Sequence, residues 1–303
     1  MTGLILRRFQ STGSKIIASC PKPEYDTGCT FCEVPALPFS KQIDMTTNLA
    51  STKTAPWKHV LILSHGIRDF NDMPSKIEFI PDSLSSSINH LKNGRVSAHH
   101  PILVSNILLK EHDSILKSFG IEESKKDEQL VYIYPDNKVV KFDISKTVQF
   151  IKHYLTPADH QLEAVYNPFK VAEKVKIQKD IEDEDVKDTS HNFIEYPISK
   201  NLVLICGHTK RDIRCGVLAP LLENEFSKVL QKEGLHQDTE LGLISHIGGH
   251  VYAGNVIYFP KDVDNNHGIW YGRVFPDRVQ GIVKQTIMKG NIIKELYRGQ
   301  LAD

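Results

Sequence analysis

Between residues 57 and 155 the chain alternates short apolar runs with segments whose apolar positions recur at helical spacing. Short runs rich in β-branched residues are typical of buried strands, and the spaced pattern is typical of helices. A serine-rich start and a glycine stop predict a helix at 83–94, and a serine also precedes the helical spacing at 145–155. Strands are predicted at 57–64, 102–109, 130–135 and 138–144.

The second half of the chain repeats this order of elements. In each half a strand–helix–strand unit precedes two further strands and a closing helix, which is the thioredoxin-like arrangement. We therefore predict an α/β protein built from duplicated thioredoxin-like folds. The matching segments are 59–70 with 201–213, 102–109 with 241–246, 129–135 with 255–260, and 141–155 with 274–287.

Charge and pattern also predict domain boundaries. Residues 166–199 are rich in Lys, Asp and Glu and lack a strand pattern, which predicts a linker or a solvated helix. An N-terminal domain is expected at 24–165 and a C-terminal domain at 200–303. No cysteine lies in the core segments of the first domain, so we expect a degenerate, structural or partner-binding unit without a metal site.

The first 23 residues differ from the rest of the chain because they contain no acidic side chain. Arg7, Arg8, Lys15 and Lys22 are interspersed with apolar and hydroxyl residues. This composition predicts a mitochondrial targeting segment at 1–23, and the alternative is an ordinary basic tail. We expect a mitochondrial protein, in the matrix, the intermembrane space or both.

The overall composition excludes some classes of protein. Lys plus Arg and Asp plus Glu are balanced at 37 each, so no overall field favours nucleic acid or an anionic membrane. The sequence contains no run of about 18 apolar residues, so no transmembrane helix is expected. Five cysteines in 303 residues are too few for a disulfide scaffold and suit metal or redox chemistry better.

Four residues in the second half have the character of metal ligands. Cys206 and Cys215 form a Cys-x8-Cys pair, and His246 and His250 form a His-x3-His pair that encloses two glycines. Both pairs follow predicted strands, where parallel α/β folds place their ligands. Thiolates and imidazoles suit zinc or an iron–sulfur centre, and the spacing of the cysteines is long for a zinc finger.

The sequence around these residues resembles thioredoxin-like [2Fe–2S] ferredoxins, which share the strand ending in cysteine, the Val256–Pro260 strand and the closing unit from Trp270. With two histidines in place of the second cysteine pair, it is similar to the sucrase/ferredoxin-like family. The resemblance implies a [2Fe–2S] cluster held by Cys206, Cys215, His246 and His250. It implies a mitochondrial one-electron carrier with protein redox partners, of use in thiol redox quality control.

Such a cluster would be neutral when oxidised, so its potential should exceed that of a four-cysteine cluster, and the imidazoles should couple reduction to proton uptake. Lys210, Arg211 and Arg214 are expected to favour the reduced anion. The alternative is a binding or scaffold protein with structural zinc. His208 and Asp212 are interpreted as solvated loop residues rather than partners of the ligands.

The remaining chemistry is sparse. We find no Ser/His/Asp arrangement, phosphate loop or dinucleotide fingerprint, so an electron-transfer protein is expected rather than an enzyme. Cys20, Cys29 and Cys32 lie ahead of the first predicted strand, which argues against a thioredoxin active site. Cys29 and Cys32 form a Cys-x2-Cys pair that is consistent with a dithiol couple, half of a metal site or two unrelated thiols.

Overall fold

The computed structural model describes residues 15–54, 56–63, 69–92, 96, 100–121, 127–157, 192–261 and 268–301. Most of the predicted targeting segment and of the predicted linker lies outside these residues. Ser64, which corresponds to Cys206 in the sequence repeat, also lies outside them.

One ten-stranded sheet carries both halves of the chain. Its order is β12-β10-β9-β7-β8-β3-β2-β4-β5-β6, and most neighbouring pairs are antiparallel. The bounds are β2 Lys58–Leu63, β3 Ile102–Leu109, β4 Glu128–Tyr134, β5 Lys138–Asp143, β6 Ile194–Pro197, β7 Asn201–Cys206, β8 Thr239–Ile244, β9 Val256–Phe259, β10 Ile269–Tyr271 and β12 Tyr297–Gln300.

The two halves of the sheet have the same internal order. In the first half β2 is parallel to β3 and antiparallel to β4, which pairs with β5. In the second half β7 is parallel to β8 and antiparallel to β9, which pairs with β10. The halves meet where β3 and β8 run antiparallel, so the eight inner strands have the same order from either end. The fold is therefore mixed α/β.

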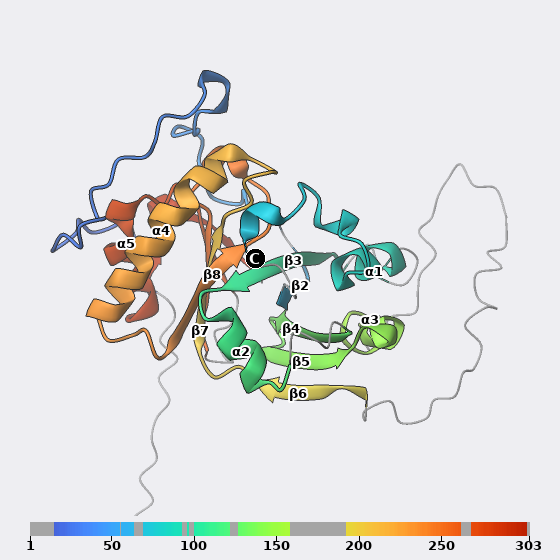
Figure 1. Ribbon diagram of the computed structural model, residues 1–303. Helices are drawn as coiled ribbons and strands as arrows, with labels where there is room; N and C mark the ends of the chain where they lie inside the picture. The colour runs from blue at the N-terminus through green and yellow to red at the C-terminus, as the bar shows by residue number, and fades with distance from the viewer. Residues whose placement is uncertain are drawn as a thin grey trace, which may run out of the picture.

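The helices gather at opposite ends of this sheet. The helices α4 and α5 lie together beside β7 and β8, whereas α1 and α3 lie beside the first half (Figure 1). The short helix α2 was not predicted. The bounds are α1 Leu84–Leu91, α2 His112–Ser118, α3 Thr147–Tyr154, α4 Ile213–Lys232 and α5 Pro276–Ile282.

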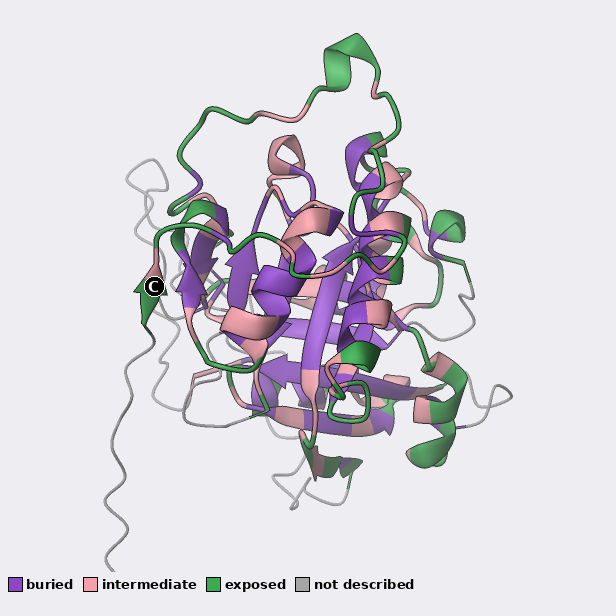
Figure 2. Cartoon of the chain, turned by 90° about the vertical axis from the view of Figure 1, so that its left-hand side faces the viewer, coloured by how far each residue is buried: buried purple, intermediate pink, exposed green. Residues whose placement is uncertain are grey.

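Alternating strand residues supply two hydrophobic cores. One face of β2 sends Val60 and Ile62 toward α1 and α3 in a smaller core. The opposite face sends Leu61 and Leu63 into a larger core shared with β7, β9 and α4. Figure 2 shows the strands as a mainly buried centre, with exposed residues concentrated on the connecting segments. The larger core therefore joins the two halves into one body.

An N-terminal segment, residues 15–54, packs along the second half and is called the strap below. Its first strand, β1 (Ile16–Ile17), pairs with β11 (Ile292–Ile293). Cys20 behind it is buried, and a side chain at Gly281 would overlap the Cys20 sulfur. The sequence assigned residues 1–23 to a leader and residues 24–54 to the first domain, but short apolar pairs carry no periodic signal that reveals this packing.

Residues 194–197 correct a second expectation, because they form the edge strand β6 against β5 although no strand pattern was evident there. Only Tyr196 of this strand is partly buried, so the backbone pairing has no matching apolar alternation.

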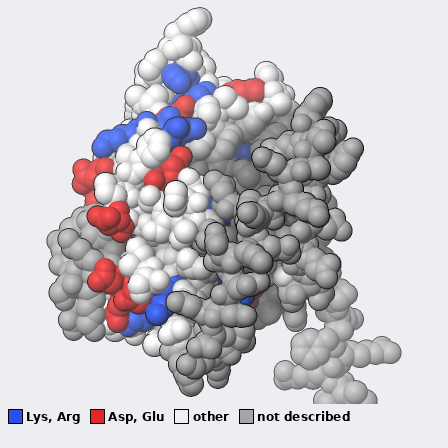
Figure 3. Space-filling model, turned by 90° about the vertical axis from the view of Figure 1, so that its right-hand side faces the viewer, with Lys and Arg blue, Asp and Glu red and all other residues white. Residues whose placement is uncertain are grey.

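Among the described residues, no helix is both long and apolar enough to cross a bilayer. On the face shown in Figure 3, acidic and basic side chains lie close together.

Candidate metal centre

The two cysteines lie at the junction of β7 and α4. Cys206 is the last residue of β7, and its N–H bonds to the Asn255 carbonyl at 2.9 Å. Cys215 lies in the first turn of α4, which begins at Ile213 behind the N-cap Asp212. The Asp212 carboxylate accepts the Arg214 N–H at 3.0 Å and so caps the start of the helix.

The two thiols are buried in contact with one another. Cys206 and Cys215 are 2% and 1% exposed. The Cys215 thiol donates to Cys206, and this bond lowers the pKa of Cys206 well below its usual value. The same bond, together with burial, raises the pKa of Cys215. The pair therefore releases one proton readily and holds the second, as expected when a single S–H serves two sulfurs.

The histidines lie on the loop that follows β8. His246 comes two residues after the strand ends, and His250 begins a short 3-10 turn at His250–Tyr252. Their ring centroids are 5.5 Å apart. His246 also contacts the Cys206 thiol. The predicted ligands therefore form one line of contacts, from Cys215 through Cys206 and His246 to His250.

The His250 ring has two different edges. Its Nδ1 is buried without a hydrogen-bond partner, whereas Nε2 lies 4.0 Å from Asp212 Oδ2. Partial burial lowers the pKa of His250, and Asp212 opposes that shift. A neutral imidazole with one free nitrogen and a carboxylate near the other is the usual condition of a metal-binding histidine.

His208 and Asp212 are not the solvated loop residues that the sequence suggested, because both are buried. The His208 Nε2 contacts the Pro74 carbonyl at 2.8 Å, and its Nδ1 accepts the backbone N–H of His246 at 3.2 Å. Asp212 binds the Arg214 guanidinium at 2.8 and 2.9 Å. Burial lowers the pKa of His208, so a neutral imidazole positions the ligand-bearing loop.

Arg298 is a second buried cation that interacts with this centre, beside Arg214, and it was not predicted. It comes from β12, is fully buried, and interacts electrostatically with Cys206 and Cys215. Its described hydrogen-bond acceptors are neutral: the Asn255 Oδ1 at 2.7 Å, the Gly248 carbonyl at 3.3 Å and two oxygens of Thr52. Burial lowers the pKa of Arg298 to about 10.

A glycine in the loop that carries the histidines leaves room for the Arg298 guanidinium. Gly249 has φ +68°, and a Cβ there would overlap the Arg298 guanidinium. The second of the two glycines between the histidines therefore admits Arg298 beneath the loop. The Asn255 Nδ2 donates to the Gly249 carbonyl at 2.9 Å.

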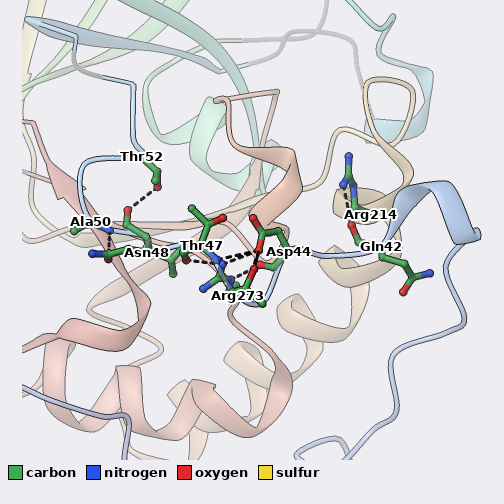
Figure 4. A network of polar contacts seen from close by, with 10 residues as sticks. Gln42, Asp44, Thr47, Asn48, Ala50, Thr52, Arg214 and Arg273 are labelled. Atoms are coloured by element: carbon green, nitrogen blue, oxygen red, sulfur yellow. Dashed lines mark hydrogen bonds and ion pairs between the residues drawn. The ribbon is translucent and has the colours of Figure 1, made fainter.

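The strap fixes the other side of the centre. Arg214 donates to the Gln42 carbonyl at 3.0 Å, and Arg273 binds the backbone of Asp44 and Thr47 (Figure 4). Farther along, Thr54 donates to the Ile247 carbonyl at 3.0 Å. Of the three cations placed between the cysteines in the sequence, Arg214 is paired with Asp212, and Lys210 and Arg211 are exposed. Arg298 adds a buried positive charge that interacts with both cysteines.

The donor set can be tested against the expected group. Among the described residues, no group of three or more His, Cys, Asp or Glu side chains is already arranged to hold a metal ion. The donors are instead an inner pair of thiols and an outer pair of imidazoles. Two thiolates and two imidazoles suit a two-iron cluster, in which each iron has its own ligand pair. The free, buried Nδ1 of His250 agrees with this chemistry.

The comparisons with known proteins agree with the motifs. The sucrase/ferredoxin-like family model matches residues 49–299. "Altered inheritance of mitochondria protein 32" from Clavispora lusitaniae is 49% identical over 95% of this chain and 96% of its own. The protein of that name from Meyerozyma guilliermondii is 46% identical over 94% and 95%. The resemblance predicted from the motifs is therefore confirmed.

One solved structure also matches in part. A thioredoxin-like [2Fe–2S] ferredoxin from Aquifex aeolicus is 18% identical, covering 34% of this chain and 93% of its own. The TM-score is 0.27, which is too low to establish a shared fold.

Proposed function

Since the chain belongs to the sucrase/ferredoxin-like family, we propose that it is a mitochondrial redox protein that carries single electrons on a [2Fe–2S] cluster. The ligands are Cys206, Cys215, His246 and His250. In this proposal the two halves of the sheet are two thioredoxin-like units, of which only the second holds a cluster. The matching strand order of the halves supports that interpretation.

The observation that carries the proposal is the line of contacts between the four donors. Two segments about 40 residues apart in the chain deliver them to one place, because β7 and β8 are parallel neighbours and end at the same edge. The cluster would supply a one-electron couple when bound. The chain supplies a buried pair of thiols, a partly exposed pair of imidazoles and the packed segments around both.

The positions of the donors give the centre an inside and an outside. The thiols are fully enclosed, whereas the side chain of His250 is 40% exposed. Electrons should therefore enter and leave on the histidine side, where a partner protein can approach closest. Protons reach the same side, where the Asp212 carboxylate faces the ring of His250.

Arg298 sets the electrostatic environment. Two buried thiolates are costly in a medium of low dielectric unless a positive charge offsets them. None of the described hydrogen-bond partners of the Arg298 guanidinium is a carboxylate. We therefore expect its positive charge to act on the thiolates. It favours the more negative state of the centre, which raises the reduction potential.

Purification without air tests the proposal. The protein should be coloured, with a charge-transfer spectrum in the visible range, and should contain iron and acid-labile sulfide in equal amounts. A colourless protein with stoichiometric zinc would contradict the proposal and support a structural zinc site. A colourless protein without either metal would contradict both.

The mitochondrial location is tested separately. The names of the relatives and the acid-free start of the chain support it. Residues 1–23 fused to a reporter should direct it to mitochondria, and Arg7→Glu with Arg8→Glu should abolish import. We expect any processing cut to lie before Ile16, because β1 and Cys20 pack against the second half. A reporter that stays in the cytosol would reject the location and leave the cluster untouched.

A further inference from the structure

The strap carries a second pair of thiols in a tight turn. The Cys32 N–H donates to the Cys29 carbonyl at 3.0 Å, which closes a four-residue β-turn. The Cα atoms at the ends of such a turn lie less than about 7 Å apart, and a disulfide needs about 4.4–6.8 Å. Both thiols are free, and Cys32 is within hydrogen-bonding reach of Cys29. The backbone therefore holds the pair at the separation of a disulfide.

The two thiols have different surroundings. Cys29 is 2% exposed and its Sγ lies 3.8 Å from the Leu221 carbonyl of α4. Cys32 is exposed, beside Phe31, which is 65% exposed. Burial, followed by the contact with Cys32, raises the pKa of Cys29. An accessible thiol next to a protected one is the arrangement of an attacking and a resolving cysteine.

A buried carboxylate lies beneath the turn. Glu225 of α4 is fully buried, and both of its oxygens accept hydrogen bonds from the strap. Thr30 donates to one oxygen at 2.8 Å and Thr27 donates to the other. Thr27 also accepts the backbone N–H of Cys29 at 3.1 Å. A buried carboxylate costs free energy, and a role in proton transfer would explain why it lies under the thiols.

We propose that Cys29 and Cys32 form a reversible dithiol/disulfide couple that exchanges with a disulfide of a partner polypeptide, with Glu225 as the proton acceptor for Cys29. This couple is separate from the proposed metal centre. Leu221 lies six residues after Cys215 on α4, which corresponds to about 9 Å along the helix axis.

The exchange balances without a further oxidant. The Cys32 thiolate attacks one sulfur of the partner disulfide, forms a mixed disulfide and releases the partner's first thiolate. The Cys29 thiol passes its proton to Glu225, attacks the Cys32 sulfur and releases the second thiolate. The partner gains two electrons and leaves as a dithiol, while the protein keeps the Cys29–Cys32 disulfide. The reverse sequence oxidises a partner dithiol.

Oxidised glutathione, used on the full-length protein, tests the proposal. Wild-type protein should lose the thiols of Cys29 and Cys32 together, release two glutathiones and retain none at the end point. Mass spectrometry after alkylation should find the link between these two positions. The variant Cys29→Ser should stop at a stable glutathione adduct on Cys32, and Cys32→Ser should react far more slowly because Cys29 is enclosed.

Glu225→Gln tests the proton acceptor, with Glu223→Gln on the same helix as the matched control. Loss of a general base should slow the resolving step by about tenfold or more, and the gap should narrow as the pH is raised. A merely structural role would give no such pH dependence. An unchanged rate in Glu225→Gln would overturn the assignment of Glu225.

Wild-type protein that keeps a glutathione on Cys32 would overturn the couple itself. If Cys29→Ser does not fold, as judged by thermal melting, the stoichiometry of the wild-type reaction decides alone. The visible spectrum and iron content should be the same in all these variants. Failure of the couple therefore leaves the proposed cluster standing, and the reverse also holds.

Discussion

The two halves of the sheet share one strand order but differ in what surrounds it. In the second half, β7 ends in a buried cysteine and α4 runs for 20 residues from a carboxylate N-cap. In the first half, the corresponding helix α1 has 8 residues and a serine N-cap. The strap covers the second half, and its described hydrogen bonds to other elements run to that half. The two halves therefore share a strand order but differ in the segments that cover it.

The two halves share a strand order and differ in the side chains at the strand ends, so we attribute the proposed chemistry to those side chains. The parallel pair β2–β3 repeats the parallel pair β7–β8, so strand ends converge in both halves. In the sequence, histidines follow strand ends in both halves, but only the second half has cysteines there, with Arg298 and the strap closing over them. A fold provides positions, and the residues placed there decide the function.

The largest effect is expected from the inner thiols. Cys206→Ser and Cys215→Ser should lose nearly all iron, because a hydroxyl is a poor ligand for iron in a sulfide cluster. The second half should also melt at a lower temperature, since ligand binding and folding are coupled. Iron assays on anaerobically purified protein measure the loss. Cys32→Ser, an exposed thiol of the strap, is the control and should retain full iron.

Replacing the outer ligands should change the potential rather than abolish the centre. His246→Cys or His250→Cys adds a negative charge, which should lower the reduction potential by about 100 mV or more. Wild-type potential should fall as pH rises, because reduction takes up a proton on an imidazole, and the variants should show a shallower slope. Spectroelectrochemical titration measures both. A potential independent of pH in wild type would remove the histidines from the ligand set.

Arg298 gives the third prediction. The sequence pointed to Lys210, Arg211 and Arg214 as the cations that act on the centre, whereas the structure adds the buried Arg298. Arg298→Gln should lower the potential by about 60 mV, the equivalent of a tenfold change for one electron. Arg298→Lys keeps the charge and should recover most of the shift. Lys210→Gln, an exposed position between the cysteines, should have little effect. An equal shift in Lys210→Gln would contradict the role given to the buried guanidinium.

The smallest effect concerns the contact between the halves. His59 of β2 is fully buried against Phe259 and Trp270 of the second half, and burial lowers its pKa to about 3. In the unfolded chain the imidazole binds a proton with a pKa near 6.5. The free energy of unfolding therefore has its full value above that pH and decreases as the pH falls toward 3.

At pH 5.5 this loss is about 1 kcal/mol of unfolding free energy. His59→Gln should reduce the dependence of stability on pH between 7 and 5, whereas His90→Gln, at an exposed position, should leave it unchanged. Denaturant unfolding at several pH values measures the difference. A pH dependence that is identical in His59→Gln would show that the two halves do not hold this imidazole neutral.

The sequence determined most of the regular elements and the family. Short apolar runs predict strands where the structure has β2, β3, β4, β5, β7, β8 and β9, because a strand covered on both faces is apolar almost throughout. The four candidate ligands were visible because two cysteines and two histidines lie together on glycine-bearing segments that follow predicted strands. The predicted cluster, the targeting segment and the domain boundaries remain predictions.

Tertiary structure alone decided what surrounds the ligands. The strap has no periodic apolar pattern, yet backbone and side-chain hydrogen bonds hold it to the second half. Arg298 lies 83 residues beyond Cys215 in the chain, and only the pairing of β12 with β10 brings it to the site. Asp212 and His208 are polar and adjacent to a glycine-bearing loop, so their burial could not be predicted. A local sequence pattern indicates whether a residue faces the core or the solvent. The groups that pair with a buried charge come from segments far away in the sequence, so the local pattern does not reveal them.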